Sequence, residues 1–240
     1  MSAVNSLQNS FASAWQLIAS GDAALWAIIG RSLAVSGMAT LLGFALGAAV
    51  GAWLAVSRFA GRGAVIALLN AMLALPSVVV GLLVYLLLSR SGPLGYLGWL
   101  FSFKAMVLAQ TCLVLPIVAA WVRQALEDAD LRHGEQISAM GAGRSMRGLL
   151  LLLDERFVLL TILIAAFGRA IAEVGAVMIV GGNIDGFTRV MTTAIALETS
   201  KGDLPLALGL GIVLMLIVLM LNALAAVIKG WREQREAWAV

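Results

Sequence analysis

The feature that constrains this chain most is a set of five long stretches with almost no charge. Four of them hold no charged residue, and the fifth holds only Arg169 and Glu173. Each is close to the ~20 apolar residues that a helix needs to cross a bilayer, and none shows the alternating polarity of a membrane β-strand. With 62% hydrophobic and 12% charged residues, the chain is too apolar for an ordinary soluble domain. The sequence therefore predicts an all-α integral membrane protein with five transmembrane helices, over residues 32–57, 63–89, 105–122, 157–184 and 204–228.

The longest polar interruption between these stretches is residues 127–157. Interpreted as a short helix over residues 135–141, it offers Ile137 and Met140 to an apolar face and leaves Glu135 for another surface. A loop that only connects two membrane helices needs no such pattern, so the segment predicts a docking element for a cytoplasmic partner. A solvated basic loop that fixes topology is the alternative, because one basic amphipathic segment is a weak signal.

The distribution of Lys and Arg predicts the orientation, because cytoplasmic loops are enriched in these residues. If residues 127–157 are cytoplasmic, the opposite side holds five of the 16, and Arg169 lies within the membrane. The two-to-one bias places the N-terminus outside and the C-terminus inside. The cytoplasmic set comprises Arg58, Arg62, Arg123, Arg132, Arg144, Arg147, Arg156, Lys229, Arg232 and Arg235.

The N-terminal residues 1–21 lack the basic start of a signal peptide. Their apolar residues recur at helical spacing, which predicts a helix on the outer membrane surface, with a disordered tail as the alternative. Gly21 and Asp22 then resemble a helix stop and an N-cap. The predicted division is an outer interfacial segment 1–24, a membrane domain 25–230 and a cytoplasmic tail 231–240.

Two further segments are predicted to lie outside. The glycine-rich residues 181–186 predict a flexible loop. Residues 191–203 predict a short helix that returns toward the membrane. This helix would contact an external partner, help to close a gate, or serve only as a polar connector.

Small residues and prolines mark the first three apolar stretches. Gly43, Gly47 and Gly51 lie on one helical stripe, which allows close approach of another helix from this chain or from a second copy. Pro76 and Pro116 predict bent second and third helices, since proline frees a backbone carbonyl. Bent helices suit a protein that rearranges around a cavity, although static membrane helices also contain proline.

The fourth stretch holds two charges four residues apart, Arg169 and Glu173. They share a helical face, and Arg169 lies about 18 Å along a helix that starts near Phe157, since each residue rises roughly 1.5 Å. A charge at that depth costs on the order of 2.5–3.5 kcal/mol, so neither side chain is expected to face lipid. The pair either fixes the helices as an ion pair or lines a polar pathway.

The sequence offers no catalytic set, with neither a phosphate-binding loop nor a metal-ligand cluster. His133 is expected to be a surface polar residue. Cys112, inside the third stretch, is expected to be a small buried hydrophobe. The chain is therefore predicted not to be an enzyme and to hold no metal and no cofactor of its own.

The central loop resembles the cytoplasmic coupling loop of permeases from binding-protein-dependent ABC importers. The family pattern is Glu-Ala-Ala, three residues, Gly, nine residues and then Ile-x-Leu-Pro. Glu135 and Gly141 have this separation, and residues 151–153 match Ile-x-Leu. The departures concern the fine geometry of the loop and fall at Gln136, Ile137 and Asp154.

Other motifs resemble the molybdate and tungstate branch of these permeases. Residues 75–81 look like its second helix, residues 168–175 carry its Gly-Arg-x-x-x-Glu-x-Gly pattern, and Gly-Asn-Ile follows at 182–184. Residues 191–203 are most similar to the tungstate type. The resemblance covers roughly residues 25–230.

This resemblance implies one half of a type I ABC importer fold in the cell membrane, with a cytoplasmic coupling helix. Two copies would form the pathway, two ATPase subunits holding ATP and Mg would dock inside, and an oxyanion-binding protein would dock outside. The lipid bilayer is expected to surround the chain, and no nucleic-acid partner is expected. The implied docking residues are Glu135, Ser138, Gly141, Arg144 and Leu151, and the implied pathway or gate residues are Pro76, Ser77, Arg169, Glu173, Asn183 and Thr192.

Tungstate is the expected ion, with molybdate or sulfate as close alternatives, since the receptor typically sets the selectivity of an importer. A self-contained channel or ion-coupled carrier is a different class of alternative. The lack of an internal repeat and the presence of a docking loop disfavour it. A membrane-embedded enzyme fits least, because the chain offers no catalytic set.

Overall fold

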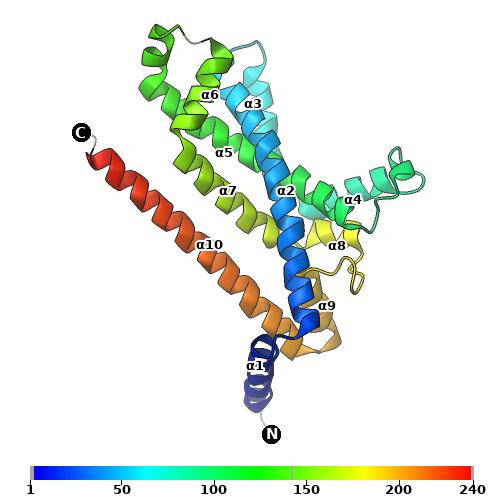
Figure 1. Ribbon diagram of the computed structural model, residues 1–240. Helices are drawn as coiled ribbons and strands as arrows, with labels where there is room; N and C mark the ends of the chain where they lie inside the picture. The colour runs from blue at the N-terminus through cyan, green and yellow to red at the C-terminus, as the bar shows by residue number, and fades with distance from the viewer. Residues whose placement is uncertain (1–2, 142, 239–240) are drawn as a thin grey trace. The chain divides into compact units, whose positions relative to one another are not determined.

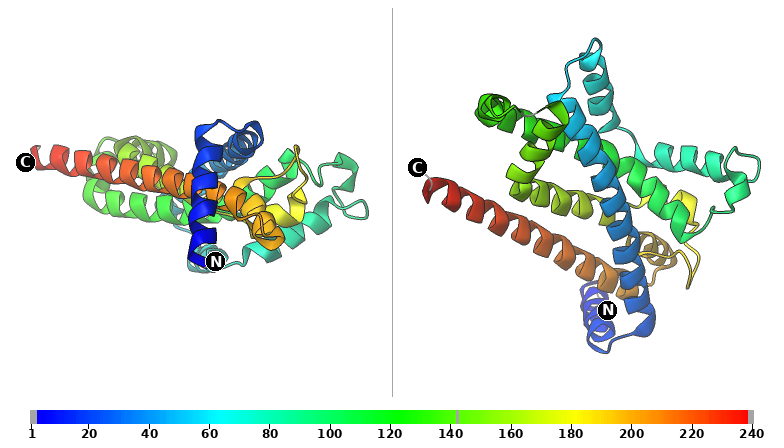
Figure 2. Two further views of the ribbon diagram at one scale, coloured as in Figure 1. Left: turned by 90° about the horizontal axis from the view of Figure 1, so that it is seen from below. Right: turned by 45° about the horizontal axis from the view of Figure 1, so that its top comes forward.

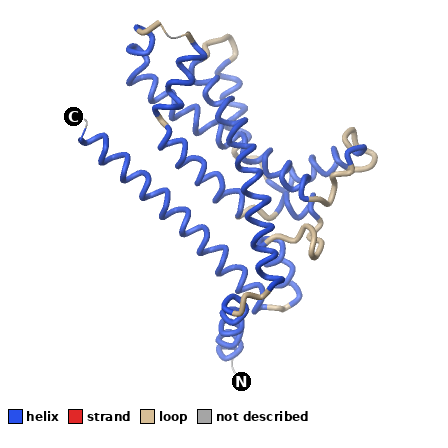
Figure 3. The backbone as a smooth tube through the Cα atoms, in the orientation of Figure 1, coloured by secondary structure: helices blue, strands red, loops and turns tan. Residues whose placement is uncertain are grey.

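The computed structural model describes residues 3–141 and 143–238. All regular elements within these ranges are helical, as the tube in Figure 3 shows. This confirms the predicted all-α class. The elements labelled in Figure 1 are α1 (Ala3–Ala19), α2 (Ala23–Val56), α3 (Arg62–Met72), α4 (Ser77–Leu88), the 3-10 helix η1 (Gly95–Leu97), α5 (Phe103–Ala139), α6 (Arg144–Asp154), α7 (Arg156–Ile171), α8 (Gly175–Gly181), α9 (Met191–Lys201) and α10 (Leu204–Trp238).

Three of the described helices, α2, α5 and α10, are long and apolar enough to cross a membrane. Two pairs of shorter helices, α3 with α4 and α7 with α8, are long and apolar enough to do so when each pair is taken together. Each pair is bent at a break of four residues or fewer, so the number of spans among the described residues is three, or up to five if each pair is one span. The five predicted spans are the upper limit of this range.

The contacts divide the chain into two compact units. The first unit comprises the chain up to Met38, Ser77–Gln110 and Ile171–Met220. The second unit comprises Ala39–Pro76, Thr111–Ala170 and the chain from Leu221 on. Each unit is described by itself below.

In the second unit, the glycine stripe of α2 packs against α5 of the same chain. A Cβ atom added to Gly43 would lie 2.8 Å from Val114 Cγ1, and one added to Gly51 would lie 2.6 Å from the Ala119 carbonyl oxygen. At Gly47 the added atom would lie 2.8 Å from the Leu115 carbonyl oxygen. Only a hydrogen side chain allows these backbones to approach so closely.

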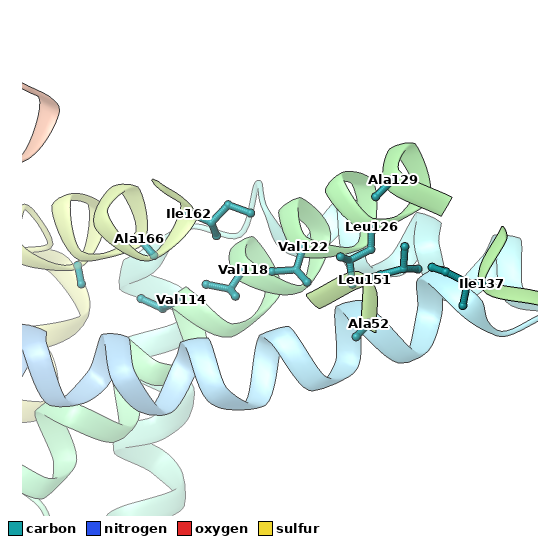
Figure 4. Close-up of a cluster of buried hydrophobic side chains, with 11 residues drawn as sticks. Ala52, Val114, Val118, Val122, Leu126, Ala129, Ile137, Leu151, Ile162 and Ala166 are labelled. Carbon is teal, nitrogen blue, oxygen red and sulfur yellow. The ribbon is translucent and has the colours of Figure 1, made fainter. Parts of the chain in front are cut away.

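A hydrophobic cluster fills the centre of the second unit (Figure 4). Side chains from α2, α6 and α7 meet a continuous row from α5, including Val122 and Leu126, both fully buried. Where these helices lie in lipid, which is itself apolar, close packing of these side chains rather than their transfer from water holds the four helices together. Its members are Ala52, Val114, Val118, Val122, Leu126, Ala129, Ile137, Leu151, Ile162, Ala166 and Ala170.

The predicted single bent helix over residues 63–89 is instead two helices, α3 and α4, joined by a short loop in the right-hand view of Figure 2. Pro76 ends the loop, and proline both lacks an N–H group and disfavours a helical residue before it. The N–H groups of residues 73–75 therefore bond carbonyls only three residues earlier, at 3.1–3.3 Å. Pro116, by contrast, lies inside the continuous helix α5.

In the first unit, the predicted N-terminal helix is confirmed as α1. Its Ala14 is fully buried and lies next to Gly209 of α10, whereas Trp15 is 64% exposed. Gly21 ends the helix with a φ of 70°, and Asp22 Oδ1 accepts a hydrogen bond from the Leu25 N–H at 2.8 Å. The predicted stop and N-cap are therefore confirmed.

Candidate functional site

The predicted separate helix over residues 135–141 does not form. Residues 127–139 continue α5 without a break, residues 140 and 141 form a turn, and α6 begins at Arg144. The segment 117–139 contains no proline to stop the helix. We call the end of α5 from Asp130, the turn and α6 up to Glu155 the docking hairpin; all of it belongs to the second unit.

Two glycines build the turn of the docking hairpin in different ways. Gly141 has a φ of 78°, in the left-handed region that favours glycine. Gly143 precedes α6 with a φ of −68° and a ψ of 168°, which any residue adopts. Neither glycine has another atom within 4 Å of an added Cβ. The backbone conformation of Gly141, rather than crowding, therefore requires a glycine there.

Two ion pairs fasten α6 and the start of α7 to α5. Arg147 Nε lies 2.5 Å from Asp130 Oδ1, and Arg132 Nη2 lies 2.6 Å from Glu155 Oε1. The Glu155 side chain is only 7% exposed. Gly134 gives room to the first pair, since an added Cβ would lie 2.4 Å from Arg147 Nη2. Charge-assisted hydrogen bonds of this kind fix the geometry of the hairpin.

The solvent-exposed face of the docking hairpin is partly apolar. Glu135 is exposed, and the methionines Met140 and Met146 are 72% and 52% exposed. Flexible methionine side chains adapt to a partner surface, and such faces are typical of protein contacts. The further exposed apolar residues of the hairpin are Leu131, Leu149 and Leu153.

The predicted docking residues divide into three groups. Glu135 and Gly141 lie at the exposed end of the hairpin. Ser138 and Arg144 lie in α5 and α6, but their side chains are outside the described part of the chain. Leu151 requires a correction, because it is fully buried in the hydrophobic cluster and is not available to a partner. We assign Leu151 to packing of α6 on α5.

A second group of predicted residues meets in the first unit around the break before α8. We call Ser77, Glu173, Asn183 and Thr192 the helix-break cluster. Glu173 Oε1 accepts hydrogen bonds from the Gly175 and Ala176 N–H groups at 2.9 and 3.3 Å. The Thr192 hydroxyl donates to the Glu173 carbonyl oxygen at 2.8 Å.

The other two members of the helix-break cluster complete the contacts. A Cβ added to Gly175 would lie 2.9 Å from Ser77 Oγ. Asn183, with a φ of 50°, donates from Nδ2 to the Thr193 carbonyl oxygen at 3.3 Å. The bonds of Thr192 and Asn183 thus join separate chain segments through backbone carbonyl oxygens, which short polar side chains reach readily.

Pro76 and Arg169 belong to the second unit rather than to the helix-break cluster. Pro76 closes the α3–α4 break, and Arg169 lies exposed in the last turn of α7. Whether Arg169 pairs with Glu173 or lines a pathway stays a prediction.

Two side chains differ from what the sequence indicates. Cys112 is exposed in α5 rather than buried. No spacing in the sequence singles out Glu155, which is nearly buried and accepts a hydrogen bond from Arg132. Among the described residues, no group of three or more His, Cys, Asp and Glu side chains is arranged to hold a metal ion.

Comparison with known proteins supplies relatives for this architecture. The chain is 41% identical to a probable anion ABC transporter permease of Haloferax volcanii, with 84% of this chain and 89% of the relative covered. It is 38% identical to the tungstate uptake system permease of Peptoclostridium acidaminophilum, with 89% and 93% covered. It is 32% identical to the molybdenum transport system permease of Escherichia coli, with 74% and 82% covered. No family model matches the chain.

The long apolar helices and the relatives together define a multi-pass membrane component of a transport system. The chain belongs to the permease subunits of ABC transporters. The resemblance to the molybdate and tungstate branch, based on separate motifs, is thereby confirmed.

Proposed function

We propose that this chain is the membrane-spanning subunit of an ATP-driven tungstate importer. The observation that carries the proposal is the 38–41% identity to two tungstate uptake permeases, from Peptoclostridium acidaminophilum and Campylobacter jejuni. Two copies form the translocation pathway, ATPase subunits dock on the cytoplasmic side, and an oxyanion-binding protein delivers the ion outside. ATP and Mg belong to the ATPase subunits.

The docking hairpin is the element that receives the ATPase. The exposed Glu135 and the neighbouring methionines offer a contact surface, while Leu151 anchors α6 in the hydrophobic cluster. The two ion pairs add to this anchor, so a force on the exposed face moves α5 and α6 together. Such coupling requires two arrangements of similar free energy, each favoured by a different state of the ATPase.

The helix-break cluster is the part of the first unit best suited to a gate. Its members offer hydroxyl, amide and backbone groups, and the Glu173 carboxylate is occupied by backbone N–H groups. Contacts of this kind are weak individually, and a pathway needs weak contacts so that a dianion is not trapped. Pro76 and Arg169 are the remaining candidates for the pathway.

Molybdate or sulfate is the second candidate cargo. The observations that favour it are the identities of 32% to a molybdenum permease and 30% to a sulfate permease of Synechocystis. Both are lower than the identities to the tungstate permeases.

The test is uptake into vesicles that contain this chain with its ATPase and its receptor. Radiolabelled tungstate, molybdate and sulfate are supplied separately, with ATP or with a non-hydrolysable analogue. The proposal expects accumulation of tungstate above the other two ions, only with ATP and only with the ATPase present. Accumulation without any ATPase would show a carrier or channel instead.

A further inference from the structure

A charged clamp ties α3 to α5 in the second unit, next to the docking hairpin but outside it. Arg62, the first residue of α3, forms an ion pair with Glu127 of α5. Arg123, one helical turn before Glu127, lies 2.5 Å from the other carboxylate oxygen. We call Arg62, Arg123 and Glu127 the inner clamp. One carboxylate thus receives two guanidinium groups, one on each oxygen.

The inner clamp also reaches α2. Arg62 Nε donates to the Leu54 carbonyl oxygen at 3.0 Å, so the guanidinium bonds the backbone of α2 and the carboxylate of α5 at once. The side chains are 28%, 14% and 29% exposed for Arg62, Arg123 and Glu127. Partial burial makes the pair stronger than one at a free surface, and it raises the cost of removing one member.

Helix α3 has little else to hold it. Among its residues only Leu69 is buried, in a small cluster with Leu54, Ala119 and Ala120. Beyond α3 the chain enters the break that ends at Pro76 and continues into α4. The position of the start of α3 therefore depends on the inner clamp, and the carboxylate that holds it lies on the helix that carries the docking hairpin.

We propose that Arg62 and Glu127 are positioning residues of the transport cycle: they transmit the movement of α5 to α3 and to the break before α4. The inference rests on the proposed function, because it needs an ATPase that moves the hairpin. On this account, cutting the clamp leaves ATP hydrolysis in place and lowers the amount of ion moved for each ATP.

The experiment compares Arg62→Gln and Glu127→Gln with the unmodified complex, reconstituted with ATPase and receptor. Assembled complex, ATP hydrolysis and uptake of tungstate, molybdate and sulfate are measured on the same vesicles. We expect the number of ions moved per ATP to fall at least about five-fold, with ATP hydrolysis within about two-fold of the unmodified complex. Arg62→Lys, which keeps the charge, restores most of the ratio.

Arg58→Gln is the matched control, since Arg58 is an exposed arginine in the same α2–α3 connection. An unchanged ratio in Glu127→Gln would overturn the inference. Uptake and hydrolysis that fall in equal proportion would also overturn the inference, because they would show a purely structural effect. The same loss in Arg58→Gln would overturn it by showing a general effect of charge. If the unmodified complex accumulates none of the three ions with ATP, the proposed function fails and the inference fails with it. Normal uptake with an unchanged ratio in the variants removes the inference alone.

Discussion

The docking hairpin and the helix-break cluster are both built from interrupted helices, but different forces hold them. Ion pairs between side chains fasten the hairpin, as between Arg147 and Asp130. The helix-break cluster is held by hydrogen bonds to backbone atoms, and beside it α4 and α8 pack backbone against backbone, as at Gly81 and Ala176. Side-chain pairs contribute modestly and are replaceable, whereas a backbone contact leaves no room for substitution. The difference predicts unequal sensitivity to mutation.

The largest effect is expected where α4 meets α8. In Gly81→Leu the new Cβ would lie 2.7 Å from Ala176 Cα, a backbone atom that no rotamer change moves away. Overpacking typically costs about 1–3 kcal/mol, and a fixed backbone puts this site at the upper end. We expect little folded protein on size-exclusion chromatography in detergent. Gly211→Leu in α10, where nothing lies within 4 Å, is the control; equal yields would refute the close contact.

The turn of the docking hairpin offers a pair of identical substitutions with unequal outcomes. Gly141→Ala places a side chain at a φ of 78°, at a cost of roughly 1–3 kcal/mol, whereas Gly143→Ala at −68° costs almost nothing. ATP-driven uptake should fall about five-fold or more in the first variant and stay normal in the second. Receptor binding should be unchanged in both. Equal uptake by the two variants would show that this turn conformation does not matter for coupling.

Glu173 separates a capping role from a charged pathway role. Glu173→Ala removes the acceptor of the Gly175 and Ala176 N–H groups. The loss of such an acceptor at the start of a helix costs about 0.5–2 kcal/mol of stability. Glu173→Gln keeps an acceptor oxygen and loses only the charge. We expect uptake to fall in the alanine variant and to survive largely in the glutamine variant. Equal loss in both would assign the function to the charge.

The smallest effect is expected for one ion pair of the hairpin. Asp130→Asn removes the charge opposite Arg147 but keeps an acceptor oxygen for its guanidinium, so we expect a loss of only about 0.2–1 kcal/mol. The thermal midpoint should fall slightly at low salt, and the difference from the unmodified chain should shrink in high salt. Asp128→Asn, at an exposed neighbouring position, is the control. A loss as large as that of Gly81→Leu would contradict the contrast between the two regions.

Features set by local chemistry could be predicted from the sequence. The apolar stretches predicted the helices, and Gly21 with Asp22 predicted the boundary between α1 and α2. The spacing of Gly43, Gly47 and Gly51 predicted close packing, although not that α5 is the partner. These inferences required only neighbours within one or two turns.

Features set by distant residues could not be predicted. Leu151 matched the family pattern, but its burial depends on residues of α5 more than twenty positions away. Arg132 and Glu155, or Arg62 and Glu127, follow no spacing rule, because their contact exists only after the helices have packed. In the α3–α4 segment, Pro76 predicts an interruption of the helix, but a bend and a full break look alike in sequence.

The central claim is that the docking hairpin lies on the cytoplasmic face and is covered there by an ATPase. The direct measurement is labelling of a Glu135→Cys variant with a membrane-impermeant maleimide, in a chain whose Cys112 is replaced by Ser. The account predicts labelling in inverted vesicles, none in right-side-out vesicles, and loss of labelling when the ATPase is bound. Labelling in right-side-out vesicles, or labelling that the ATPase does not reduce, would contradict it.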